Sequence, residues 1–223
     1  MNNLSLTVIM AVTNEENLDV SVKSYLNAGS AFKNVRILIA DCIGDEASAV
    51  AIKKLLAENT GSISVMDFEA LPSRAEVYSK GLSLTYDGYV CFTESAVNLN
   101  NKALRFVKKA IKKHPDCPVE ISVKTRNKNE NFIGYSKLDG LANFCDLNEV
   151  PYNAALAIFG YFFRAEDIKD IDFDFSIGEE ALKKFILEAL LKKPCISYSN
   201  KKTYKIQTIW NNLSFFINKS IHY

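Results

Sequence analysis

Four short apolar runs in the first half of the chain are separated by three amphipathic runs. The apolar runs have the length of buried strands and cover residues 6–12, 35–40, 63–66 and 89–92. The amphipathic runs carry apolar residues at helical spacing and cover residues 17–26, 46–58 and 72–84. Because strands that alternate with helices form βαβ units, the sequence predicts an α/β fold with a mainly parallel sheet.

Local signals predict where two of these helices begin. Thr13 and Asn14 are both suitable caps for the helix over residues 17–26. Pro72 suits the first turn of the helix over residues 72–84, because a first-turn N–H has no intrahelical partner.

The second half of the chain continues the pattern less regularly. We expect a helix over residues 102–113, strands over 119–125, 154–163 and 195–199, a helix over 179–192 and a polar, irregular segment over 126–149. Apolar side chains at near-helical spacing then indicate an amphipathic tail over residues 208–223. The tail has three open roles: it docks on the domain, contacts a membrane surface or a second copy, or begins a further region of a longer chain.

The composition excludes several classes of protein. A net charge of +1 over 223 residues gives no global attraction to nucleic acid. The five cysteines form no C-x-x-C pair and only two histidines accompany them, so a structural zinc site is not expected. Free thiols favour a reducing cytoplasm. The chain also lacks the glycine-rich phosphate loops and the G-x-S-x-G elbow, which argues against the common nucleotide-binding loops and against a serine hydrolase.

Polar residues follow three of the predicted strands. Thr13, Asn14 and Glu15 follow the first strand, Asp41 follows the second, and Glu94 follows the fourth. Ligands of open α/β sheets bind outside the carboxyl ends of the strands, so these residues are expected to line one site. The pattern is typical of a nucleotide site that uses acidic side chains in place of a glycine-rich loop.

These segments carry a family resemblance. Residues 6–16, LTVIMAVTNEE, resemble the opening strand and turn of family 2 glycosyltransferases of the GT-A fold. Further similar segments follow in the family's order: ILIAD at 37–41, KGL at 80–82, DGYVCFTE at 87–94, FFR at 162–164, FD at 173–174 and GEEA at 178–181. The resemblance covers about residues 4–207.

The resemblance implies a divergent member with a GT-A-like, Rossmann-related fold. Its sheet is mixed but mainly parallel, with helices on both faces. One domain over residues 1–207 would then hold a nucleotide-sugar half, about 1–98, and an acceptor half, about 99–207. The departures are Ala11 for a proline, Tyr78-Ser79 for an arginine-asparagine pair, Glu94-Ser95-Ala96 for Asp-x-Asp, and Glu179-Glu180 for Glu-Asp.

By resemblance, five residues surround the nucleotide-sugar donor: Thr13, Asn14, Glu15, Asp41 and Arg74. Asp41 would pair with the donor base, and Arg74 would lie near the diphosphate. Each also has a purely structural alternative. Asp41 suits a cap or a turn, the first three residues suit the start of a helix, and Arg74 suits an ion pair with Glu76 or another surface acid.

Two further sites follow from the resemblance. Glu94 would hold a Mg²⁺ or Mn²⁺ ion, although Ala96 removes the second carboxylate of the motif. Glu180, with Glu179 beside it, would be the base that takes the acceptor's proton. The alternatives are a hydrogen-bonded loop acid at Glu94 and, at Glu179 and Glu180, acids that favour the positive end of a helix.

The sequence therefore predicts an inverting glycosyltransferase. It would move a sugar from a nucleotide-sugar, in particular a UDP-sugar, to a saccharide or lipid-linked acceptor in cell-envelope polysaccharide assembly. We expect a cytoplasmic protein, with contact at the inner face of the membrane as a further option. The rival hypothesis is a degenerate domain that binds nucleotide, glycan or a protein partner without turnover. A nucleotidyltransferase-like enzyme is a third hypothesis.

Overall fold

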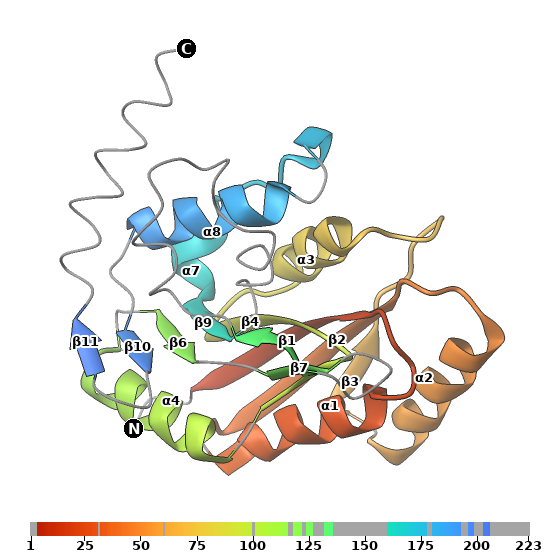
Figure 1. Ribbon diagram of the computed structural model, residues 1–223, viewed down its shortest axis with the longest axis horizontal. Helices are drawn as coiled ribbons and strands as arrows, with labels where there is room; N and C mark the ends of the chain where they lie inside the picture. Colours follow the sequence, from red (N-terminus) through yellow and green to blue (C-terminus); the bar gives the residue numbers. More distant parts are fainter. Residues whose placement is uncertain are drawn as a thin grey trace.

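A computed structural model describes residues 4–30, 32–59, 61–99, 101–115, 118–121, 124–126, 132–135, 160–177, 180–192, 196–198 and 203–205. Eight strands of these residues form one sheet (Figure 1). In spatial order they are β11 (Thr203–Lys205), β10 (Ile196–Tyr198), β6 (Val119–Ile121), β9 (Tyr161–Arg164), β4 (Tyr89–Glu94), β1 (Ser5–Val12), β2 (Asn34–Asp41) and β3 (Ile63–Val65).

The sheet is mixed, and its first half is parallel. β1 runs parallel to β2 and β4, and β3 runs parallel to β2. β9 lies antiparallel between β4 and β6, β10 runs parallel to β6, and β11 closes the edge in an antiparallel pair. The carboxyl ends of β1, β2 and β4 therefore meet at one edge of the sheet.

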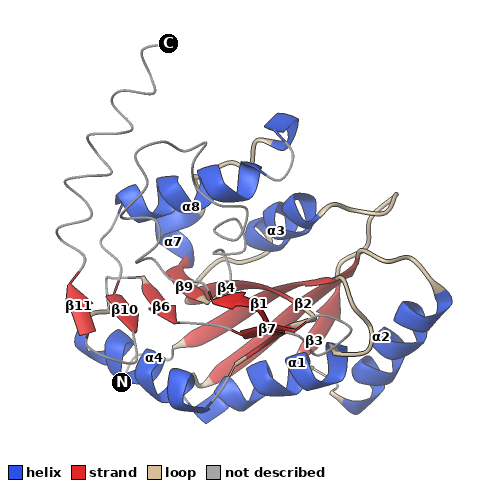
Figure 2. Ribbon diagram, in the orientation of Figure 1, coloured by secondary structure: helices blue, strands red, loops and turns tan. Residues whose placement is uncertain are grey.

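Helices cover both faces of the sheet (Figure 2). One face carries α1 (Leu18–Leu26), α2 (Glu46–Glu58) and α4 (Asn101–Lys113), and the other carries α3 (Arg74–Ser83), α7 (Ala165–Ile168) and α8 (Glu180–Lys192). Short 3₁₀ turns follow α1, as η1 (Asn27–Ser30), and precede α8, as η4 (Phe175–Ile177). The predicted mixed α/β sheet with helices on both faces is confirmed.

The core lies where β1 is covered on both faces. Every residue of β1 from Leu6 to Val12 is buried, which explains why this strand is apolar on both faces. α3 packs so closely on β1 that a Cβ on Gly81 would lie 2.3 Å from Cγ2 of Ile9. Glycine is thus required at this position by packing.

Two helices begin one or two residues later than predicted, and the predicted cap of the first one is wrong. α3 begins at Arg74 and not at Pro72, because Ser73 caps it in a capping box with Glu76. The first helix begins at Leu18 with Asn17 at the cap position, not Thr13 or Asn14. The Asn14 side chain stabilises the turn before the helix, because its Oδ1 accepts the Asn17 N–H at 3.1 Å.

The predictions for the second half need three corrections. The strand expected over 119–125 is two strands in different sheets, because β7 (Lys124–Arg126) pairs with β5 (Val97–Asn98) and β8 (Phe132–Tyr135) in a small second sheet. β8 lies inside the segment predicted to be irregular. β11 was not expected, since three residues give too short a pattern. The first residues of the strand predicted over 154–163, and the tail at 208–223, lie outside the described residues.

Candidate functional site

The ends of β1 and β4 are joined by one buried hydroxyl. The parallel register pairs Ala11 with Glu94, so the residues that follow each strand are neighbours. The Ser95 Oγ accepts the backbone N–H of Thr13 at 3.1 Å and that of Asn14 at 2.8 Å, while the Ser95 N–H donates to the Ala11 carbonyl at 3.1 Å. Ser95 is fully buried. It therefore fixes the turn after β1 against the turn after β4.

Glu94 lies beside this joint and both of its carboxylate oxygens are engaged. Thr13 Oγ1 donates to Oε2 at 3.2 Å, and the Nη1 of Arg74 donates to Oε1 at 2.5 Å. The side chains of Arg74 and Glu94 are only 20% and 12% exposed. The predicted residues Thr13, Arg74 and Glu94 are thus brought into direct contact.

Glu76, the acid considered as a partner of Arg74, is engaged at the start of α3. Glu76, three positions from Ser73, accepts hydrogen bonds from the Ser73 N–H and hydroxyl, both at 2.7 Å. These bonds also lower the pKa of Glu76. Arg74 forms an ion pair with Glu94, at the end of β4, and a pair with Glu76 stays a prediction.

Asp41 ends β2 next to the same edge, since the register pairs it with Val12. Its Oδ1 accepts the N–H groups of Ile43 and Gly44 at 2.9 and 3.1 Å, and its Oδ2 accepts the Ser48 hydroxyl at 2.7 Å. Asp41 therefore has the hydrogen bonds of a turn residue, which is the structural alternative to binding a donor base. A carboxylate has about four lone-pair sites, so three bonds still leave capacity for a ligand N–H. Contact with a donor base stays a prediction.

Cys42 lies among these charged groups and was not singled out in the sequence. Its pKa is raised to about 12, first by burial and then by the charges of Asp41 and Glu94, against which Arg74 acts in the opposite direction. The thiol therefore stays protonated at neutral pH. Its position shows that Asp41, Glu94 and Arg74 share one electrostatic environment, which no local sequence signal could reveal.

Tyr78 stands where the resemblance expects an arginine, and the structure gives it a supporting role. It is fully buried, and its hydroxyl donates to the Thr93 carbonyl at 3.1 Å. Burial raises its pKa well above the usual value, with a smaller contribution from Glu94. This hydrogen bond therefore connects α3 to β4 at Thr93, the residue immediately before Glu94.

The remaining predicted residues lie less centrally. Asn14 is buried and its side chain binds Asn17, and Glu15 is half-buried with its carbonyl accepting the Leu18 N–H at 3.2 Å. Glu180 is exposed at the first residue of α8, on the same face of the sheet as α3 (Figure 1). Glu179 lies outside the described residues.

A metal site is not evident among the described residues. No group of three or more histidine, cysteine, aspartate or glutamate side chains within them is placed to hold an ion. No helix in the same part of the chain is both long and apolar enough to cross a membrane.

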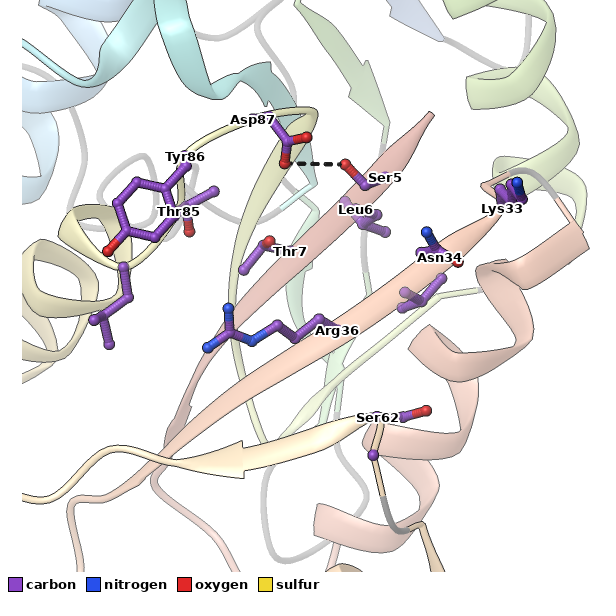
Figure 3. A pocket seen from close by; sticks show the side chains of 13 residues that line it. Ser5, Leu6, Thr7, Lys33, Asn34, Arg36, Ser62, Thr85, Tyr86 and Asp87 are labelled. Atoms are coloured by element: carbon purple, nitrogen blue, oxygen red, sulfur yellow. Dashed lines mark hydrogen bonds between the residues drawn. The ribbon is translucent and has the colours of Figure 1, made fainter. Parts of the chain in front are cut away.

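A hollow of about 470 Å³ lies at the opposite edge of the sheet (Figure 3). Its lining comes from the starts of β1 and β2 and from the turn after α3, including Ser5, Arg36, Tyr86 and Asp87. Thirteen residues line it, and none belongs to the predicted donor site. This hollow is therefore distinct from the predicted donor site at the carboxyl edge.

Comparison with known proteins identifies the fold. A scan against family models finds no match, and a search of curated proteins finds none. Among solved structures, residues 1–349 of Staphylococcus aureus TarS in complex with UDP match at a TM-score of 0.66 and 15% identity over 96% of this chain. The same fragment with UDP-GlcNAc matches at 0.61 and 17% identity over 90% of this chain. A further structure of S. aureus TarS matches at a TM-score of 0.65 and 15% identity over 98% of this chain.

The likeness to TarS, a glycosyltransferase, shows a GT-A-like glycosyltransferase fold. The chain spans only part of these neighbours: 65% of the UDP-bound fragment, 58% of the UDP-GlcNAc-bound fragment and 40% of the further TarS chain.

Proposed function

We propose that this chain is a glycosyltransferase that takes a sugar from a nucleotide-sugar, in particular a UDP-sugar. The acceptor would be a saccharide or lipid-linked sugar of the cell envelope, and transfer would invert the anomeric centre. The protein would act in the cytoplasm or at the inner face of the membrane. These finer assignments come from the sequence resemblance.

One observation carries the proposal. In a fold shared with TarS, which has been solved with UDP and with UDP-GlcNAc, the contact set of Thr13, Arg74 and Glu94 lies at the carboxyl ends of β1 and β4. Asp41 ends the neighbouring strand. Ligands of α/β sheets bind at this edge. The arrangement thus combines hydrogen-bonding groups for a nucleoside with a cation for a diphosphate.

The proposed roles follow from the chemistry of each group. Thr13, Asn14 and Glu15 would line the nucleoside, and Asp41 would accept the base N–H. Arg74 would bind the diphosphate, whose negative charge grows as the bond to the sugar breaks. Glu180 would take the proton of the acceptor hydroxyl.

The residues at the end of β4 do not fit a tightly held divalent cation. Magnesium is usually held by one or two carboxylates together with substrate phosphates. Here Ala96 supplies no second carboxylate, and Glu94 is already paired with a guanidinium. The Mg²⁺ or Mn²⁺ ion expected at Glu94 stays a prediction, and none of the proposed roles requires it.

The second candidate function is nucleotide or glycan binding without turnover. The exposure of Glu180 favours it, because enzymes commonly tune the carboxylate of a general base by burial, which this position does not provide. A protein partner remains part of this alternative, as does contact with a membrane or a second copy through residues 208–223.

A thermal-shift screen with UDP, UDP-sugars and other nucleotide-sugars, each with and without Mn²⁺, tests the proposal. A ligand at about 100 times its dissociation constant should stabilise the fold by roughly 2.7 kcal/mol. Absence of a shift with every nucleotide and nucleotide-sugar would refute the proposed function. A shift without release of UDP from any UDP-sugar, across a panel of saccharide and lipid-linked acceptors, would favour the binding function.

A further inference from the structure

The end of β4 holds an ion pair at the position where the sequence predicts a metal. Glu94 Oε1 accepts from Arg74 Nη1 at 2.5 Å, and Oε2 accepts from Thr13 Oγ1 at 3.2 Å. A divalent ion on Glu94 would therefore have to displace the guanidinium or share the carboxylate with it. Because like charges this close repel, sharing is unfavourable, and Arg74 and a metal ion compete for Glu94.

The local structure fixes Arg74 at this position. It is the first residue of α3, directly after the Ser73 cap, and the capping box with Glu76 holds this turn. Glu94 is fixed from the other side, because Ser95 ties the end of β4 to the turn after β1. Two separately anchored elements thus meet in the ion pair.

We infer that Arg74 is the cation of the donor site and that Glu94 is its counter-ion, so that UDP binds without a divalent metal. The inference rests on the proposed function, because it concerns the same nucleotide site. A guanidinium is well suited to the role: its planar donors match two phosphate oxygens at once, and its charge persists at any working pH. A fifth of the Arg74 side chain is exposed to solvent.

The inference and the metal hypothesis predict opposite effects for Glu94→Gln. If Glu94 holds a metal, the substitution weakens UDP binding. If Glu94 is the counter-ion, glutamine keeps the size of the side chain, removes a negative charge from the diphosphate site and binds Arg74 less strongly. UDP binding should then tighten by about two- to fivefold, the scale of a partly exposed charge interaction.

Calorimetric titration of UDP, in EDTA and in Mn²⁺, tests the inference with the wild type, Glu94→Gln, Arg74→Met and Arg74→Lys. The wild type should show the same Kd in both buffers. Arg74→Met should weaken binding in EDTA by about tenfold or more, and Mn²⁺ should restore part of it because Glu94 has lost its cationic partner. Arg74→Lys should lose less. Unfolding temperatures establish that each variant is folded.

Matched controls use the same substitutions at the other end of the sheet. The control variants are Arg36→Met, at a residue that lines the hollow at the amino edge, and Glu58→Gln, at the last residue of α2. Both should bind UDP as the wild type does.

Three outcomes overturn the inference. UDP binding that requires Mn²⁺, or that is weakened by Glu94→Gln, would make Glu94 a metal ligand and leave the proposed function standing. Unchanged binding by Arg74→Met in EDTA would remove Arg74 from the site and also leave that function standing. No UDP binding by the wild type in either buffer would overturn the inference, and failure of all nucleotide-sugars would overturn the function as well.

Discussion

Replacing Ser95 with alanine should loosen the joint between the ends of β1 and β4. The substitution deletes the acceptor of two N–H groups: that of Asn14, at 2.8 Å and buried, and that of Thr13, at 3.1 Å and partly buried. An unpaired buried N–H costs about 1–3 kcal/mol, and a partly hydrated one costs about 0.5–1 kcal/mol. The expected loss of unfolding free energy is therefore about 1.5–4 kcal/mol.

Chemical denaturation and thermal unfolding measure this loss. For a chain of this length, 1 kcal/mol corresponds to roughly 2–4 °C, so the unfolding temperature should fall by about 3–16 °C. Ser83→Ala is the control, since its hydroxyl makes an exposed bond to the Lys80 carbonyl within α3. That variant should change stability by less than about 0.5 kcal/mol.

The effect should extend to the site. Thr13 donates to Glu94 from the turn that Ser95 holds, so folded Ser95→Ala should also bind UDP more weakly than the wild type. A loss of stability no larger than that of Ser83→Ala would refute the reasoning. It would mean that the two N–H groups find other acceptors and that the joint does not depend on Ser95.

Four further substitutions and measurements follow from the structure. Gly88→Ala should destabilise by about 2–4 kcal/mol in denaturant titrations, because φ is +75° and the new Cβ would lie 2.6 Å from the Ser5 carbonyl oxygen; wild-type stability would contradict this. Asp41→Asn should weaken UDP binding by about tenfold in calorimetry; a fall in unfolding temperature with unchanged affinity would assign Asp41 to the turn alone. Glu180→Gln should lower turnover at least about 100-fold with UDP affinity retained, and unchanged turnover would exclude it as the base. Cys42, with a pKa of about 12 against an ordinary 9.0, should be alkylated slowly below pH 9 and faster as the pH rises, because only the thiolate reacts; rapid labelling at pH 7, followed by peptide mass spectrometry, would contradict that environment.

The alternation of strands and helices was predictable because it rests on local hydrophobic periodicity. The core of β1, the bounds of α2 and the position of the carboxyl edge all follow from that signal. The small sheet was missed for the same reason: β7 and β8 have three and four residues and pair mainly with each other, so their sequence gives no clear period.

The partner of Arg74 shows what a local pattern both reveals and conceals. Ser73 and Glu76 have the spacing of a capping box, a local pattern that assigns Glu76 to the start of α3. The ion pair of Arg74 with Glu94, 20 residues away in the sequence, depends on how α3 packs on β1 and β4. Such a contact belongs to the tertiary structure and has no local signal.

A structure of the protein with UDP tests the central claim most directly. The account predicts UDP at the carboxyl edge, with the base within hydrogen-bond distance of Asp41 and the diphosphate on Arg74. UDP in the hollow at the amino edge, beside Arg36 and Tyr86, would contradict it. So would UDP at the carboxyl edge with no contact to Asp41, Arg74 or the turn after β1.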